Sequence, residues 1–249
     1  RAPALARAKG AMSLPAPRPA AGAAAEAGGE GHEDYAEAGR RLLEAVNLGQ
    51  LGTSGQPARY SPCDPLWRHP ETGATLYVGN AQTAASREAL RQLGITRVVN
   101  CQDADGRNHF EGDPELTYLS FSIGLWRSAP RVLDGGEGTW RFFQPFFVFV
   151  LDSLREGNNV FVHCLAGAHR AGTAGIALLM LLCGWDAARA TASAKQLRPA
   201  IRPIAGFPDL LQALDRARSG REQALGVGRE RGALAAGEDD NEFKRPRTG

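Results

Sequence analysis

The sequence predicts an α/β fold in which a mostly parallel central sheet is flanked by helices on both faces. Between about residues 72 and 218, short apolar segments typical of strands alternate with longer segments typical of helices. Such alternation requires crossover connections, which make neighbouring strands parallel and place helices on both faces of the sheet. Outside this region the composition changes, because Ala, Gly and Pro dominate the first 71 residues and polar residues dominate the end.

Each predicted strand is short and apolar at its centre. Val98 and Val99 lie at the centre of one strand, and another alternates apolar and polar residues from Leu116 to Ile123. The predicted strands are residues 76–79, 96–101, 116–123 and 160–163. The predicted helices are residues 84–93, 138–155, 171–183, 187–196 and 207–217.

These elements predict a compact domain over residues 72–218, a typical size for one hydrophobic core. Residues 1–71 are expected to form a low-complexity, disordered extension, because they carry too few large apolar side chains to offset the entropy cost of ordering. One short helix, at residues 35–48, is expected within it. The acid-free stretch 1–25 is also typical of an organelle transit segment. Residues 219–249 are expected to form a polar disordered tail.

The overall composition is that of an ordinary globular protein, with 43% hydrophobic and 22% charged residues. A net charge of +2 selects neither nucleic acid nor a membrane as partner. The longest apolar run, Ile176 to Cys183, is too short to span a bilayer. Scattered cysteines argue against a zinc ribbon or a disulfide scaffold and favour a reducing compartment.

These features predict a cytoplasmic protein that needs no metal ion and no cofactor. The nucleus is an alternative compartment because of the basic cluster at residues 244–247, and an organelle is another if the extension is a transit segment. The oligomeric state is left open by the sequence.

A cysteine placed six residues before an arginine is the first sign of chemistry, but that spacing alone has no discriminating power. It occurs at Cys101 and Arg107, at Cys164 and Arg170, and at Cys183 and Arg189. Cys183 ends an apolar helix, and the segment after Cys101 contains two aspartates that would repel a phosphate dianion. Only Cys164 follows a buried strand, has an acid-free loop after it, and precedes a helix.

This context predicts that the loop from Cys164 to Arg170 binds phosphate. The residues between them are Leu165, Ala166, Gly167, Ala168 and His169. Backbone N–H groups and the positive end of the following helix would surround the anion, and the same field favours the thiolate form of Cys164. Gly167 would permit torsions that other residues resist, and the Arg170 fork can hold two phosphate oxygens.

The chemistry expected of such a loop has two steps. Cys164 attacks phosphorus to give a phosphocysteine, and water then hydrolyses this intermediate. The leaving group needs a proton, so a carboxylic acid should stand opposite the thiolate.

The string His163-Cys164-Leu165-Ala166-Gly167-Ala168-His169-Arg170 resembles the signature of the dual-specificity branch of the cysteine-dependent protein tyrosine phosphatase superfamily. The resemblance extends over about residues 72–218. Similar strings stand at residues 76–80, 93–100 and 197–199. It implies a compact phosphatase fold and hydrolysis of phosphotyrosine, phosphoserine and phosphothreonine, with a phosphorylated protein as partner.

The resemblance also implies site residues. The general acid of this family is an Asp about thirty residues before the nucleophile, which here indicates Asp134, with Glu137, Asp103 and Asp105 in reserve. It implies that His163 tunes the nucleophile through hydrogen bonds. It also suggests that Cys101 is a redox partner able to form a reversible disulfide with Cys164.

Three positions depart from, or vary within, that family pattern. Ala171 stands where most members have a Ser or Thr that stabilises the departing thiolate, and Thr173 is expected to substitute partly or to cap the helix. Ile204 stands where an Asn is usual. His169 is expected either to point into the cleft, which would favour acidic substrates, or to point outward as a solvated residue.

Two other functions are compatible with these residues. The same chemistry could act on a phosphoinositide, a phosphorylated glucan or an RNA 5′-phosphate. Alternatively, Ala171 and the uncertain acid could mark a phosphate-binding pseudophosphatase, although retention of both Cys164 and Arg170 argues against it.

Overall fold

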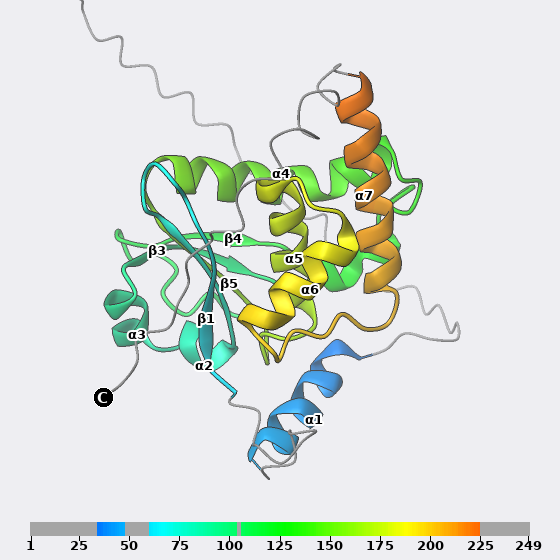
Figure 1. Ribbon diagram of the computed structural model, residues 1–249. Helices are drawn as coiled ribbons and strands as arrows, with labels where there is room; N and C mark the ends of the chain where they lie inside the picture. Colours follow the sequence, from blue (N-terminus) through cyan, green and yellow to red (C-terminus); the bar gives the residue numbers. More distant parts are fainter. Residues whose placement is uncertain (1–33, 48–59, 104–105, 225–249) are drawn as a thin grey trace, which may run out of the picture. The chain divides into compact units, whose positions relative to one another are not determined.

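The computed structural model describes residues 34–47, 60–103 and 106–224 (Figure 1). Within these ranges a five-stranded sheet has the order β1-β2-β5-β3-β4. The strands are β1 (Cys63–Arg68), β2 (Thr75–Gly79), β3 (Ile95–Asn100), β4 (Thr117–Ser120) and β5 (Asn159–His163). Only β1 is antiparallel to its neighbour, and the other pairs are parallel. The predicted α/β class with a mostly parallel sheet is therefore confirmed.

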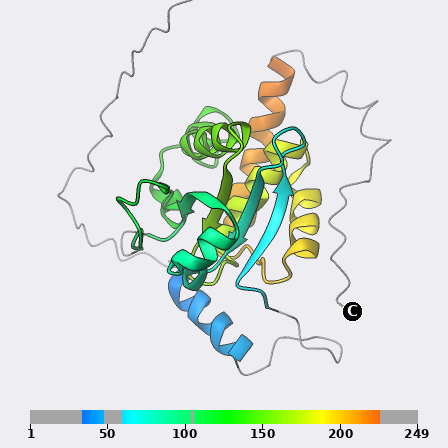
Figure 2. The ribbon, with the colours of Figure 1, turned by 90° about the vertical axis from the view of Figure 1, so that its left-hand side faces the viewer.

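The helices lie on both faces of this sheet, as predicted. The described helices are α1 (Tyr35–Asn47), α2 (Ala81–Ala84), α3 (Arg87–Gln92), the 3₁₀ helix η1 (Ile123–Ser128), α4 (Glu137–Arg155), α5 (Arg170–Cys183), α6 (Ala187–Leu197) and α7 (Phe207–Ala224), and not all of them cover a face of the sheet. Val99 and Val162 pack into a large cluster with side chains of α4, α5 and α7, whereas Val98 and Phe161 pack into a smaller one with α2 and α3. Successive strand residues thus face opposite layers; Figure 2 looks along α4.

The sheet begins before residue 72, where the domain was predicted to start. β1 was missed because it contains Asp64 and Pro65, which are rare in strands, and has no alternating pattern. Proline is tolerated there because β1 is an edge strand, and the pairing with β2 shifts in register between Pro65 and Trp67.

The predicted helix at residues 35–48 is observed as α1, and it packs on the domain. Tyr35 belongs to the large core cluster, and its ring stacks on Phe207 with centroids 4.6 Å apart. Its hydroxyl donates to the Ala205 carbonyl and accepts from the Trp126 indole N–H. The predictions for residues 1–25, 225–249 and the basic cluster at 244–247 fall outside the described residues.

Helix α5 runs through the centre of the large cluster, and all its residues from Arg170 to Met180 are buried. A Cβ at Gly175 would lie 2.7 Å from Leu66 Cδ1, so this glycine allows α5 to approach the sheet closely. The buried helix fixes the position of the loop that precedes it. No described helix is by itself long and apolar enough to cross a membrane; only α5 and α6 together, bent by 117°, satisfy length and composition.

Candidate active site around Cys164

The predicted phosphate loop connects the end of β5 to the start of α5, at the edge where the parallel strands end. In parallel α/β sheets this edge is the usual place for a ligand site. His163 is the last residue of β5, and its carbonyl accepts a hydrogen bond from the Cys101 N–H (2.7 Å) beyond the end of β3. Cys164 is almost fully buried, at 3% exposure.

Four consecutive carbonyls of the loop are turned outward. Their donors are Ala81 N to Leu165 O (3.1 Å), Tyr60 Oη to Ala166 O (2.9 Å), Arg198 Nε to Gly167 O (2.8 Å) and Arg202 N to Ala168 O (3.1 Å). In a trans peptide the N–H points away from the preceding carbonyl. The N–H groups that follow these carbonyls therefore face the inside of the loop, where they can bind an oxyanion.

Arg198 holds the outer side of the loop in place. Its side chain is fully buried, and besides Gly167 O it donates to Asp64 Oδ2 (2.7 Å) and to Ser61 O (2.7 Å). In the sequence, Arg198 stood out only as part of residues 197–199, a string similar to one in the phosphatase family. Sequence reasoning missed Asp64 and Tyr60 altogether, because both lie in the segment predicted to be a disordered extension and contact the loop only through the fold.

Gly167 is required at the tightest point of the loop. Its φ is +64°, and a Cβ there would lie 2.4 Å from the Gly79 carbonyl oxygen. Both features exclude any other residue without a backbone shift, which agrees with the prediction from the sequence.

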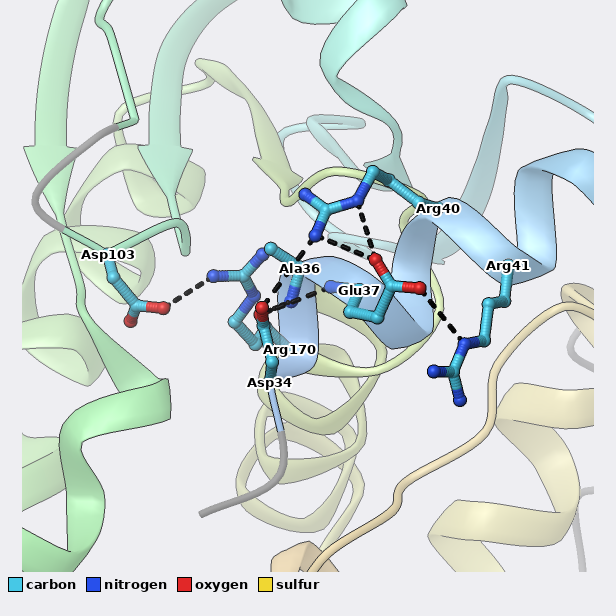
Figure 3. A network of polar contacts seen from close by, with 7 residues as sticks. All are labelled: Asp34, Ala36, Glu37, Arg40, Arg41, Asp103 and Arg170. Atoms are coloured by element: carbon cyan, nitrogen blue, oxygen red, sulfur yellow. Dashed lines mark hydrogen bonds and ion pairs between the residues drawn. The ribbon is translucent and has the colours of Figure 1, made fainter. Parts of the chain in front are cut away.

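Arg170 begins α5 and has only 3% of its surface exposed. Its Nη1 donates to Asp103 Oδ2 at 2.6 Å (Figure 3). Asp103 follows β3, and the segment after Cys101 therefore contributes to the site. The sequence indicated that the acids of this segment disfavour phosphate binding there, and it named Asp103 only as a reserve general acid. The ion pair holds the guanidinium at the mouth of the loop.

Asp134, the predicted general acid, has the contacts of a helix cap. Its Oδ1 accepts from Gly136 N (2.8 Å) and from the backbone and hydroxyl of Thr139, its Oδ2 accepts from Gly138 N, and Arg131 forms an ion pair with it. These bonds, that of Gly136 N first, hold the pKa of Asp134 below its usual value. A general acid must be protonated when it acts, so these contacts give no support to the predicted role.

The reserve acids are distributed differently. Asp103 lies at Arg170, as described above. Glu137 is the first residue of α4 and pairs with Arg221 of α7. Asp105 lies outside the described residues.

His163 is buried beneath the loop and is neutral. Desolvation, with a smaller effect of His109, lowers its pKa to about 3. Its ring stacks on Phe161, and its Nδ1 has no hydrogen-bond partner among the described residues. A neutral ring cannot stabilise the Cys164 thiolate by charge, so tuning through hydrogen bonds stays a prediction.

Two polar side chains at the start of α5 are occupied by local contacts. The Thr173 hydroxyl donates to the His169 carbonyl (2.7 Å), so its one proton is used within the first turn. His169 is only 5% exposed, and its Nδ1 lies 2.6 Å from the Arg202 carbonyl oxygen. The expected solvated orientation of His169 is therefore wrong, because the ring packs against the chain around Arg202.

Cys101 lies beside Cys164. Asn100, the last residue of β3, pairs with His163, the last residue of β5, so Cys101 and Cys164 directly follow two adjacent strands. Both are free thiols. Burial first, and then the nearby Cys164, raise the pKa of Cys101 well above its usual value, so the thiol stays protonated. The disulfide between the two stays a prediction.

Comparison with known proteins places these residues within a recognised domain. Residues 76–216 match the model of the dual specificity phosphatase catalytic domain. Mouse dual specificity protein phosphatase 26 is 33% identical over 70% of this chain and 77% of that protein. Zebrafish (Danio rerio) dual specificity protein phosphatase 22-B is 30% identical over 55% of this chain and 68% of that protein.

Other relatives are much longer. Mouse protein phosphatase Slingshot homolog 3 is 30% identical over 53% of this chain, but the match covers only 19% of that protein. Among solved structures, a mouse dual specificity phosphatase complexed with zinc tungstate has a TM-score of 0.50 and 26% identity. That match covers 72% of this chain and 99% of the mouse chain.

Proposed function

Because this chain belongs to the dual specificity phosphatase family and is a cysteine-dependent phosphatase, we propose that it hydrolyses phosphotyrosine, phosphoserine and phosphothreonine in proteins. The reaction passes through a phosphocysteine on Cys164. The observation that carries this proposal is the loop itself, in which four outward carbonyls turn the backbone N–H groups toward the space between Cys164 and Arg170.

A phosphoprotein substrate is supported by the relatives. Those that this chain matches over about two thirds or more of their length are named as protein phosphatases. The related mouse structure holds tungstate, a tetrahedral oxyanion of the same shape as phosphate. The partner proposed for this chain is therefore a phosphorylated protein.

The loop would act mainly on the transition state. As the phosphoryl group flattens between the thiolate and the leaving oxygen, its equatorial oxygens draw closer to the N–H groups and to Arg170. The S–P bond forms while the ester P–O bond breaks, and the leaving oxygen takes a proton. Water then attacks phosphorus, the P–S bond breaks, and the thiolate and inorganic phosphate are released.

The test is hydrolysis of para-nitrophenyl phosphate by the full chain, with Cys164→Ser as the inactive variant. Cys183→Ser is a matched control, because Cys183 also stands six residues before an arginine, while burial raises its pKa to about 11. We expect activity in the wild-type chain and the control, and none in Cys164→Ser. Activity in Cys164→Ser would contradict the phosphocysteine mechanism.

The substrate class requires a second comparison. Phosphopeptides with each of the three phosphoresidues are compared with a soluble phosphoinositide, a phosphorylated glucan and a 5′-phosphorylated RNA. We expect the highest kcat/KM on the phosphopeptides. A higher value on any of the other three would replace the protein substrate in this proposal.

Ala171 predicts how fast the intermediate breaks down. It is fully buried in the first turn of α5 and offers no hydroxyl to the departing thiolate, and the proton of the nearby Thr173 is already used. Rapid-quench kinetics should show a burst of product before the steady state. Ala171→Ser should raise the steady-state rate several-fold and shrink the burst. A wild-type chain without a burst would contradict slow breakdown.

A further inference from the structure

Arg170, the arginine of the phosphate loop, lies between two carboxylates in Figure 3. Asp103 contacts its Nη1 directly at 2.6 Å. Asp34 stands at the start of α1, close enough that Arg170 contributes to lowering its pKa, after the stronger effects of the Glu37 and Ala36 N–H groups. The leaving group of the proposed reaction needs a proton from a carboxyl group in this region.

Asp103 is distinguished by its second carboxylate oxygen. Oδ1 is buried and has no hydrogen-bond partner in the part of the chain that the structure describes. It lies against η1, where a Cβ at Gly124 would be 2.7 Å away. Burying a carboxylate oxygen without a hydrogen-bond partner costs free energy, so the placement of this oxygen calls for a functional reason.

Gly124 explains how Asp103 reaches this place. η1 follows β4 and reads Ile-Gly-Leu-Trp-Arg-Ser, so the helix after this strand contains no acidic residue. The absence of a side chain at Gly124 leaves the space that the Asp103 carboxylate enters. A carboxyl group from the loop after β3 thus lies against the segment after β4.

We propose that Asp103 is the general acid of this phosphatase. The proposal rests on the phosphocysteine mechanism proposed above. When a phosphate dianion binds, the Arg170 guanidinium turns toward the phosphate oxygens, and the Asp103 carboxyl group stands beside them. The Asp103 carboxyl group contacts the guanidinium that would bind the phosphate, so it stands on the side of the loop where the ester would lie.

The proton is accounted for in both steps. In the first, the S–P bond forms, the ester P–O bond breaks, and the Asp103 carboxyl gives its proton to the leaving oxygen. In the second, the Asp103 carboxylate takes a proton from water as that water attacks phosphorus and the thiolate leaves. The carboxyl group is thereby regenerated, and no other reactant is needed.

The other carboxylates near the loop are engaged in contacts of their own. Asp34 accepts from two N–H groups of α1 and pairs with Arg40, and these contacts keep it ionised. Asp64 is bound to Arg198 on the other side of the loop. Asp134 caps α4 through both oxygens. Asp103 alone among these four has a buried oxygen free of hydrogen bonds.

The experiment uses two substrates that differ in the leaving group. Phenyl phosphate releases a poor leaving group that needs a proton, whereas para-nitrophenyl phosphate releases one that needs it far less. We measure kcat/KM against pH for the full chain and for Asp103→Asn, Asp134→Asn and Cys164→Ser. For Asp103→Asn we expect a loss of about 100-fold or more on phenyl phosphate, a much smaller loss on para-nitrophenyl phosphate, and no alkaline decline. Asp134→Asn should keep the wild-type ratio between the substrates.

Inhibition by inorganic phosphate separates proton transfer from positioning. If Asp103 served only to orient Arg170, Asp103→Asn would lose activity equally on both substrates and would bind phosphate more weakly, and the proposal would be overturned. A loss confined to phenyl phosphate in Asp134→Asn would overturn it as well. Activity that survives in Cys164→Ser would instead refute the phosphocysteine mechanism, so the two failures are distinguishable. Circular dichroism of Asp103→Asn confirms that the variant is folded.

Discussion

Two arginine–aspartate pairs flank the phosphate loop, and they differ in how completely their polar atoms are used. Arg198 and Asp64 are 2.7 Å apart, and Arg198 also donates to the carbonyls of Ser61 and Gly167. Arg170 and Asp103 are 2.6 Å apart, but Asp103 Oδ1 has no partner within the described ranges. All three guanidinium nitrogens of Arg198 donate hydrogen bonds, whereas the second pair leaves one buried carboxylate oxygen without a partner.

This difference indicates that the two pairs have different roles in the site. A buried polar network in which every atom is satisfied is rigid and resists change. Arg198 and Asp64 are suited to fix the outward carbonyls, and hence the inward N–H groups, before any substrate arrives. In the second pair the guanidinium of Arg170 can bind a phosphate, and Asp103 Oδ1 has no hydrogen bond to lose when the carboxyl group acts on the leaving group. The loop combines a fixed outer side with a reactive inner side.

Removing Arg198 should have the largest effect on stability. Arg198→Ala would leave Asp64 and the Gly167 carbonyl without their buried donor, and loss of one partner of such a pair costs about 3–5 kcal/mol. Arg170→Ala should cost clearly less, because Asp103 is 36% exposed on its side chain and water can solvate it, while activity should be lost. Urea unfolding of both variants measures the difference. Equal losses of unfolding free energy in Arg198→Ala and Arg170→Ala would contradict the distinction between the two pairs.

Gly167→Ala tests the fixed side of the loop without removing a charge. The new Cβ would meet the Gly79 carbonyl at 2.4 Å and would occupy a φ of +64°. The strain and the overlap together should cost about 2–4 kcal/mol and displace the loop. Gly112→Ala is the control, since Gly112 has a φ of +96° but nothing within 4 Å of its Cβ position. A cost no greater than that of Gly112→Ala would show that the loop moves freely there.

The parts of the site that follow each other in the chain could be predicted from the sequence. Cys164, Arg170 and the strand and helix around them lie within a short segment whose apolar pattern and acid-free loop are visible locally. Tyr60 and Asp64 could not be found in this way, and Asp103 was named only as a reserve acid, without its contact with Arg170. Each reaches the loop from a distant segment, and β1, which holds Asp64, contains a proline that obscures its strand pattern.

The placement of the acid shows the same limit. Counting thirty residues back from Cys164 leads to Asp134. Spacing along the chain does not show which carboxylates are already engaged in hydrogen bonds. In the structure Asp134 lies just before α4 and accepts hydrogen bonds from the first turn of that helix, whereas Asp103, sixty-one residues before Cys164, contacts Arg170. Two residues far apart in the chain meet because β3 and β5 are neighbours in the sheet.

His163 is a second unsatisfied group under the loop, and it predicts a pH dependence of stability. Its pKa falls from 6.5 to about 3 on folding, so the unfolded chain binds a proton that the folded chain does not in this range. The contribution of the neutral His163 ring to stability is therefore fully present above pH 6.5, and it is lost as the pH falls. Between pH 6.5 and 5 the loss should be about 2 kcal/mol. Urea unfolding at these pH values should show this slope in the wild-type chain and a weaker one in His163→Gln. The same slope in both would contradict a neutral buried ring.

Both carboxylate oxygens of Asp134 accept hydrogen bonds, and its replacement should have the smallest effect on stability. Hydrogen bonds from Gly136 N, Thr139 N and Gly138 N hold its pKa below 3.8, so its contribution to stability is present above that value and is lost as the pH falls through the lowered pKa. Asp134→Asn should unfold at a slightly lower temperature than wild type at pH 7, and the difference should shrink at pH 3. Asp186→Asn, at the cap of α6, is the matched control, because Asp186 accepts from Arg189 N in the same way. Similar small shifts in the two variants would identify Asp134 as a cap. A shift absent at pH 7 would mean that its hydrogen bonds to α4 contribute nothing to stability, and would remove the main reason for preferring Asp103 over Asp134 as the acid.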